Sequence, residues 1–161
     1  MHSETQWLVD IAQKNQPEIL LPANHELSSS LQEAWRQVSG LFHITPLELA
    51  EQVAQAHGLA PADPKTFDKS VAALLSERKA RELKALPVRR DDSAVVFAIS
   101  DPSKINEIEP VLKFAVGRQV AFEICPPDEL DTYILKHYSE DLSDDGFQYK
   151  TINLDESRQG D

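Results

Sequence analysis

The chain has 161 residues, 41% of them hydrophobic, and its 16 basic and 27 acidic side chains give a formal net charge of −11. These values are typical of one globular domain or of two small subdomains that share a core. The acidic balance argues against nucleic acid as a partner, because phosphate binding needs clustered Lys and Arg. No segment approaches the roughly 20 apolar residues that span a bilayer, so we expect no direct membrane insertion.

The first 66 residues are expected to form a helical subdomain. Trp7, Leu8 and Ile11 share one face of a short helix over residues 3–15. Little neighbouring sequence is left to cover this face, so we expect an apolar contact surface for a protein partner. The alternative is that the face packs onto the next helix as part of the core.

Two capping-box patterns follow, beginning at Ser30 and at Thr45, each with Glu three positions later. We expect the first helix to stop at Gly40 and the second at Gly58, because glycine is common just beyond a helix C-terminus. The two signals together predict a helix-loop-helix. An extended connector is expected at residues 60–65.

Residues 67–140 are expected to form an α/β subdomain that begins with two short helices, at 67–75 and 77–84. Ala94–Ile99 is a continuous apolar run, which is typical of a strand covered on both faces. The strand before it alternates apolar and polar residues, so we expect one of its faces in water. The remaining patterns are a helix ending at Gly117, a strand carrying Val120, Phe122 and Ile124, and a helix with Leu130, Tyr133, Ile134 and His137 along one side.

The predicted fold class is α+β, with the helical subdomain packed on a small three-stranded sheet that carries two helices in the order β-β-α-β-α. Residues 141–161 are acidic and lose apolar periodicity. We expect them to be a disordered tail or a linker between domains.

Several segments occur in an order that is shared with one family. They are LLSERKARELKALPV (residues 74–88), AISDP (98–102), LKFAVGRQV (112–120), the PPDELDTYILKHY ending, and a weaker LELAEQVAQAHGLAPAD at 47–63. Together they resemble the N-terminal domain of the hexameric ATPases that drive type II secretion and type IV pilus assembly.

The resemblance implies a docking or regulatory domain that binds the cytoplasmic domain of an inner-membrane platform protein. It would then be cytoplasmic and peripheral to the inner membrane through that partner. In a full-length protein, the ATPase domain of the same polypeptide would be a second partner. The family's ATPase activity resides in a later domain, and no G-x-x-x-x-G-K-[ST] motif occurs in this chain. We therefore expect no enzyme activity and no cofactor.

The cysteine, the histidines and a group of carboxylates are the remaining candidates for catalytic or metal-binding residues. Cys125 is the single cysteine, which excludes an internal disulfide and fits a reducing cytoplasm, and we expect a buried side chain. The histidines lack ligand spacing, so no metal site is predicted. A catalytic site made of Asp101, Glu107 and Glu109 is disfavoured, because Asp101-Pro102 is explained as turn chemistry at a strand end.

Arg89 and Arg90 stand out in an acidic chain as candidate partner contacts. We expect them on the exposed face of a hairpin shoulder, paired with Asp91, Asp92 or Glu123, and the alternative is that they contact an anion or a partner.

Some members of the resembled family bind cyclic di-GMP through tandem motifs that open with Arg-Leu-Gly. Here Arg36 and Gly40 are the only loose stand-ins for the second opening, and the first has none. A cyclic di-GMP or other nucleotide sensor is therefore the alternative function, with these two residues as its ligand contacts.

Overall fold

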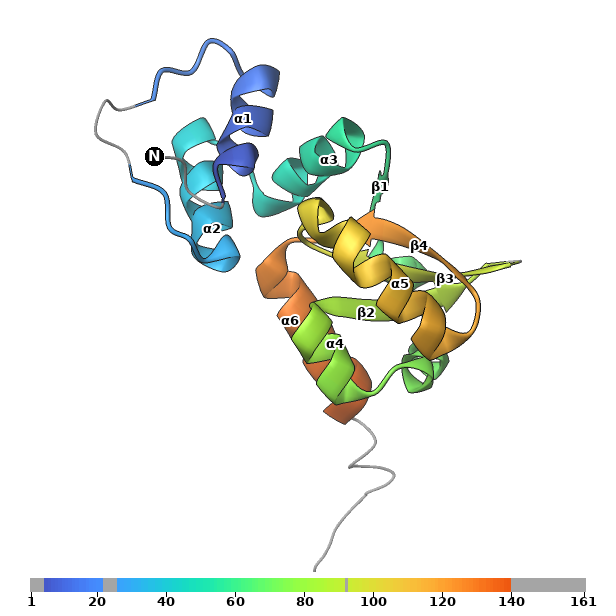
Figure 1. Cartoon of the computed structure of the whole chain (residues 1–161). Helices are drawn as coiled ribbons and strands as arrows, with labels where there is room; N and C mark the ends of the chain where they lie inside the picture. The colour runs from blue at the N-terminus through green and yellow to red at the C-terminus, as the bar shows by residue number, and fades with distance from the viewer. Residues whose placement is uncertain (1–4, 22–25, 92, 140–161) are drawn as a thin grey trace, which may run out of the picture.

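The computed structural model describes residues 5–21, 26–91 and 93–139 (Figure 1). The tail predicted at 141–161 lies outside these residues. The expected α+β class is confirmed. The elements are α1 (Gln6–Asn15), α2 (Leu31–Phe42), α3 (Pro46–Ala56), β1 (Ala60–Pro61), α4 (Glu77–Leu83), β2 (Ala85–Arg90), β3 (Ala94–Ile99), α5 (Ile105–Val116), β4 (Gln119–Ile124) and α6 (Pro127–Ser139).

Both predicted N-caps are present, but only α3 has the full capping box: at α2 the Glu33 N–H donates to Ser30 Oγ at 3.4 Å, whereas the Ser30 N–H donates to Ser28 Oγ. The Glu48 backbone N–H donates to Thr45 Oγ1 at 3.0 Å, and the Thr45 N–H donates to Glu48 Oε1 at 2.8 Å, which completes a capping box. The end predicted for α2 at Gly40 is wrong. The helix continues to Phe42, whose side chain is buried, and His43 takes the left-handed conformation beyond it with φ 57°.

The sheet has four strands in the order β1-β4-β3-β2, one more than predicted. β2 and β3 are antiparallel, whereas β3 and β4 are parallel and are joined through α5. The additional strand, β1, is the N-terminal part of the predicted connector, and Ala60 pairs with Glu123. Two residues are too few to leave a periodic pattern in a sequence.

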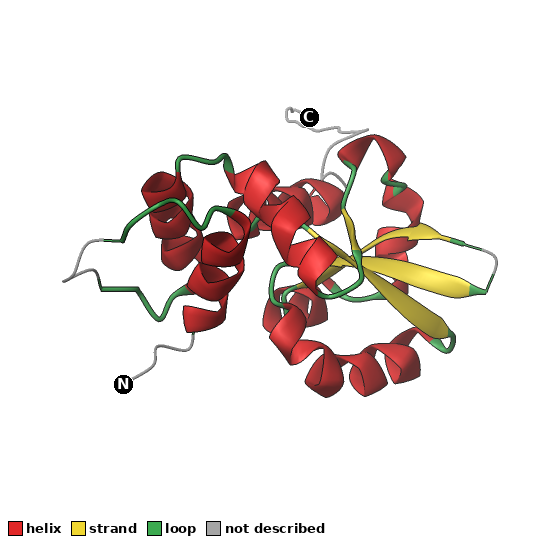
Figure 2. Ribbon diagram, turned by 90° about the horizontal axis from the view of Figure 1, so that it is seen from above, coloured by secondary structure: helices red, strands yellow, loops and turns green. Residues whose placement is uncertain are grey.

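Helices lie on both sides of the sheet (Figure 2). On one face, Phe97, Ile99 and Phe122 belong to a core that includes α5 and continues into α1, α2 and α3. On the other face, Val96 and Ala98 pack with α6 and with β2. This two-sided cover explains the continuous apolar run in β3, as the sequence predicted.

The expectation that β2 keeps one face in water is wrong for its first four residues, which are all buried. The pairing with β3 shifts between Pro87 and Arg89, so Val88 is an extra residue that breaks strict alternation. The segment predicted as a helix at 67–75 forms a 3-10 helix, Lys69–Leu74, which packs against β2. The Asp68 N–H donates to Val88 O at 2.6 Å and helps to cover this edge strand.

Phe97 and Phe114 provide a matched pair for testing the sheet. Phe97 is 0% exposed and Phe114 is 91% exposed. Phe97→Ala should cost roughly 3–5 kcal/mol of unfolding free energy through lost burial and a cavity. Phe114→Ala should change it by less than about 0.5 kcal/mol. Equal losses for the two variants in chemical denaturation would contradict the assignment of faces.

Candidate functional site

A cleft of about 490 Å³ lies where the helical and α/β subdomains meet. It is formed by the segment before α2 and its first residues, the end of α4, the end of β3, and the starts of α5 and α6. Two parallel strands, β3 and β4, end towards this region, and loops beyond such ends are where open α/β sheets usually bind ligands. The volume is within the range of ligand pockets.

The floor of the cleft is apolar and its rim is charged. Ile99, Ile108 and Leu130 are buried, at 1%, 8% and 2% exposure, and Leu31 and Leu83 are half-buried beside them. The ionisable lining side chains are four acids and two bases, a net charge of −2, namely Glu82, Asp101, Glu107, Asp131, Lys84 and Lys104.

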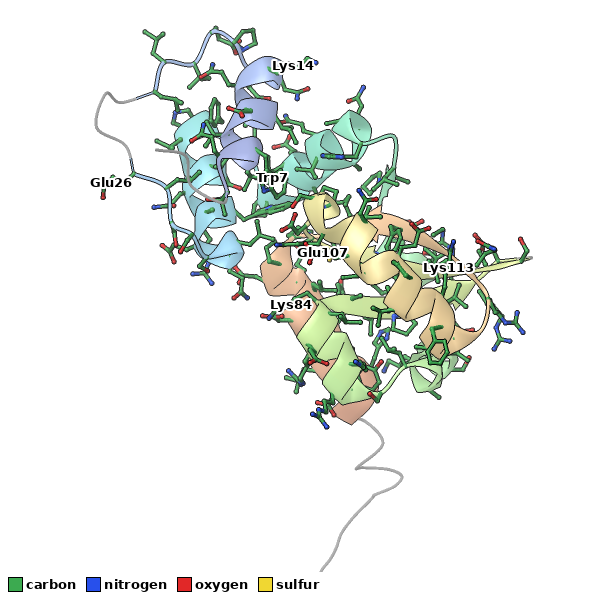
Figure 3. All side chains as sticks on the ribbon, viewed as in Figure 1. Trp7, Lys14, Glu26, Lys84, Glu107 and Lys113 are labelled. Carbon is green, nitrogen blue, oxygen red and sulfur yellow. The ribbon has the colours of Figure 1, made fainter. Side chains whose placement is uncertain are left out.

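A second hollow, of about 320 Å³, shares Ser29, Leu31, Asp101 and Lys104 with the cleft. It extends to Thr5, which directly precedes α1. Figure 3 shows Trp7, Lys84 and Glu107 around the junction of the two subdomains. The hollowed surface therefore runs from the start of α1 to the end of α4.

Polar contacts between α2 and α6 fix one side of the cleft. The Arg36 guanidinium donates to both carboxylate oxygens of Asp128, from Nε at 2.9 Å and from Nη2 at 3.0 Å. This hydrogen bonding raises the pKa of Arg36 above its ordinary value. One turn away, Gln32 Nε2 donates to Asp131. These contacts connect the helical subdomain directly to the first turn of α6.

The dinucleotide-contact prediction rested on Arg36 and Gly40. Arg36 is half exposed and uses its guanidinium on Asp128 and on Glu33, 3.4 Å away. Gly40 lies inside α2, and a Cβ placed there would meet no atom within 4 Å. No close approach of another group therefore requires glycine at this position.

The three residues predicted for the apolar contact surface differ in exposure. Leu8 is fully buried in the core, so it does not contribute to an exposed surface. Trp7 and Ile11 are half-buried and pack against that core, with part of each side chain accessible. Partner contact through Trp7 and Ile11 stays a prediction.

Arg89 forms the predicted pair with Glu123, but its side chain is only 26% exposed and does not lie on an open surface. Its guanidinium forms a two-point pair with the Glu123 carboxylate across the sheet, with Nη1 3.0 Å from Oε1. Asp91 is also near, at 3.6 Å from Nε. The hydrogen bonds to Glu123 raise the pKa of Arg89. Arg90, by contrast, is exposed, and of the two arginines it presents the more accessible side chain.

Cys125 is buried, as predicted, and burial raises the pKa of its thiol to about 12. At neutral pH this side chain is a protonated thiol and a poor nucleophile. Within residues 5–21, 26–91 and 93–139, no three His, Cys, Asp or Glu side chains group in a way that would hold a metal ion.

The sequence identified few of the cleft residues. Asp101 and Glu107 had been considered as carboxylates of a catalytic site, and both line the cleft. Glu109 does not line it, and its side chain is 3.7 Å from Lys113. The lining also draws on three further segments of the chain, at 29–32, 82–84 and 127–131, and no local pattern brings these segments together.

The fold and the cleft define an α+β domain in which a helical subdomain is packed on one face of a mixed sheet. Residues 57–144 match the MshEN domain, and the chain belongs to this family. This match confirms the resemblance to the N-terminal domains of type II secretion and pilus ATPases. No curated protein matches the chain.

Two solved structures share the fold. The structure of MshE with cdg aligns with a TM-score of 0.56 at 21% identity, over 81% of this chain and 98% of that one. The N-terminal domain of XpsE aligns with a TM-score of 0.53 at 17% identity, over 86% of this chain and 97% of that one.

The contribution of the Arg89–Glu123 pair to stability can be tested with the adjacent Arg90 as a control. The Glu123 side chain is only 12% exposed. Arg89→Ala should cost about 1–3 kcal/mol of unfolding free energy, because it leaves a poorly hydrated carboxylate without its partner. Arg90→Ala should cost less than about 0.5 kcal/mol. If urea denaturation gave the same small loss for both, the pair would contribute nothing to stability.

Proposed function

We propose that this chain is a non-catalytic docking and regulatory domain of a secretion or pilus assembly ATPase. It binds the cytoplasmic domain of an inner-membrane platform protein and is held at the membrane through that partner. None of the described helices is long and apolar enough to cross a bilayer. The observation that carries the proposal is the match of residues 57–144 to a domain found in these ATPases.

The chemistry of the described residues is consistent with binding rather than catalysis. The thiol of Cys125 is protonated at neutral pH, and three of the described arginines, Arg36, Arg81 and Arg89, are paired with carboxylates. The accessible parts of Trp7 and Ile11 supply apolar area near the junction, and Arg90 supplies an exposed positive charge elsewhere. Apolar anchors of this kind with charged surroundings are typical of protein contacts.

The second candidate is a sensor of cyclic di-GMP or another nucleotide. It is favoured by the shared fold with MshE, whose structure was solved with cdg. Two observations argue against it. Arg36 is already paired with Asp128, and Gly40 lies within a helix, where a Cβ would meet no other atom within 4 Å, so no close contact requires glycine there. Docking is therefore the function that the site supports better.

Docking can be tested with Trp7→Ser and Ile11→Ser, measured by calorimetry against the platform protein's cytoplasmic domain. We expect a loss of at least about tenfold in affinity, since interface aromatics commonly act as anchors. Because both side chains also pack on the core, a control must lower stability without altering the surface. Leu8→Ala does this, because Leu8 is 0% exposed.

Leu8→Ala should cost about 2–5 kcal/mol of stability and leave affinity unchanged below its melting temperature. Equal affinity losses in all three variants would assign the effect to stability and would remove α1 from the contact surface.

The sensor alternative predicts a dissociation constant for cyclic di-GMP below about 10 μM. Docking predicts no heat of binding up to about 100 μM. Isothermal calorimetry on the isolated domain separates the two. If binding is seen, Arg36→Ala should abolish it, because Arg36 is the loose stand-in for the arginine that opens the second motif.

A further inference from the structure

We propose that the cleft between the subdomains is the docking site for a basic, amphipathic peptide segment of the partner. This inference rests on the proposed docking function and adds to it the site and the chemistry of the occupant.

The shape of the cleft suits a peptide side chain. Leu31 and Leu83, which are half-buried, supply accessible apolar area at its sides, and the buried Ile99, Ile108 and Leu130 form its floor. A volume of about 490 Å³ accommodates one or two large apolar side chains together with part of their backbone. The second hollow continues the surface towards Thr5, so an occupant can extend along the junction.

The charges of the cleft select a basic occupant. Four carboxylates and two ammonium groups line it, which leaves a net charge of −2. Lys104 lies 4.0 Å from Glu107, so part of the positive charge is already balanced. A negatively charged rim attracts Lys or Arg side chains and raises the association rate of a basic segment.

The same charges disfavour other occupants. A nucleotide brings phosphates to an acidic rim. The chain's own residues 140–161 contain seven acidic side chains and two basic ones, and this net charge of −5 is repelled by the rim. A basic segment of another protein is the occupant that the rim favours.

An occupant of the cleft would contact both subdomains. The lining includes Leu31 and Gln32 from the helical subdomain, and Asp101 and Asp131 from the α/β subdomain. Gln32 and Asp131 also form one of the direct links between α2 and α6. An occupant that contacts both subdomains would therefore stabilise the relative arrangement in which they form the cleft.

The test reverses the sign of the rim without touching the core. Glu82 and Glu107 are exposed, with 58% and 72% of their side-chain areas accessible. The double variant Glu82→Lys/Glu107→Lys changes the cleft from −2 to +2. The control, Glu26→Lys/Glu51→Lys, makes the same change in total charge at two exposed positions that do not line the cleft.

Binding of the platform protein's cytoplasmic domain is measured for the wild type and both variants, with melting curves to establish folding. We expect the cleft variant to bind at least about tenfold more weakly, and its association rate to rise with salt instead of falling. The control should stay within about twofold of the wild type.

Equal affinities for the wild type and the cleft variant would overturn the cleft as the docking site while leaving the docking function intact. Equal losses in the two variants would also overturn it, because total charge would then explain the effect. A wild type that fails to bind the platform domain would contradict the docking function, and this inference with it.

Discussion

The parallel pairing of β3 with β4 is the constraint on which the rest of the structure depends. Because both strands run in the same direction, the chain must cross over the sheet between them, and α5 makes that crossing. Both strands then end at the same edge, where α5 and α6 begin. The cleft exists because these ends converge there and because α2 of the helical subdomain closes the remaining side.

The helical subdomain is tied to the sheet in three ways. Its apolar side chains are continuous with one face of the sheet, through Phe97 and Ile99. β1 extends the sheet by pairing with the end of β4, and the Ala62 N–H donates to Ile124 O at 2.8 Å. Arg36 links α2 to α6 through Asp128. A shared core, a strand and an ion pair together join the helical subdomain to the sheet at the junction.

The sequence predicted the elements whose signals are local. The caps at Ser30 and Thr45, the doubly covered strand Ala94–Ile99 and the stop at Gly117 needed only neighbouring residues to be recognised. The errors arose where distant packing decided the outcome. α2 runs past Gly40 because Phe42 completes the core, and a glycine in mid-helix costs only about 1 kcal/mol.

The same distinction applies to the candidate site. The sequence groups Leu8 with Trp7 and Ile11 on one apolar helical face. Whether such a face is exposed depends on which other elements pack against it, and the sequence of the helix alone does not show this. The sequence predicted that Arg89 pairs with Asp91, Asp92 or Glu123, but it could not select Glu123, which is 34 residues away in the chain, or show that the pair is partly buried. The cleft assembles residues from four segments, and only the parallel arrangement of β3 and β4 brings them together.

Hydrogen exchange of backbone amides, with and without the platform protein's cytoplasmic domain, is the most direct measurement of the central claim. The account predicts that the partner slows exchange at residues 29–32, 82–84, 99–108 and 127–131, which surround the cleft, and at the start of α1. Slower exchange that is confined to other surfaces, such as the exposed face of α5 around Phe114, would contradict it.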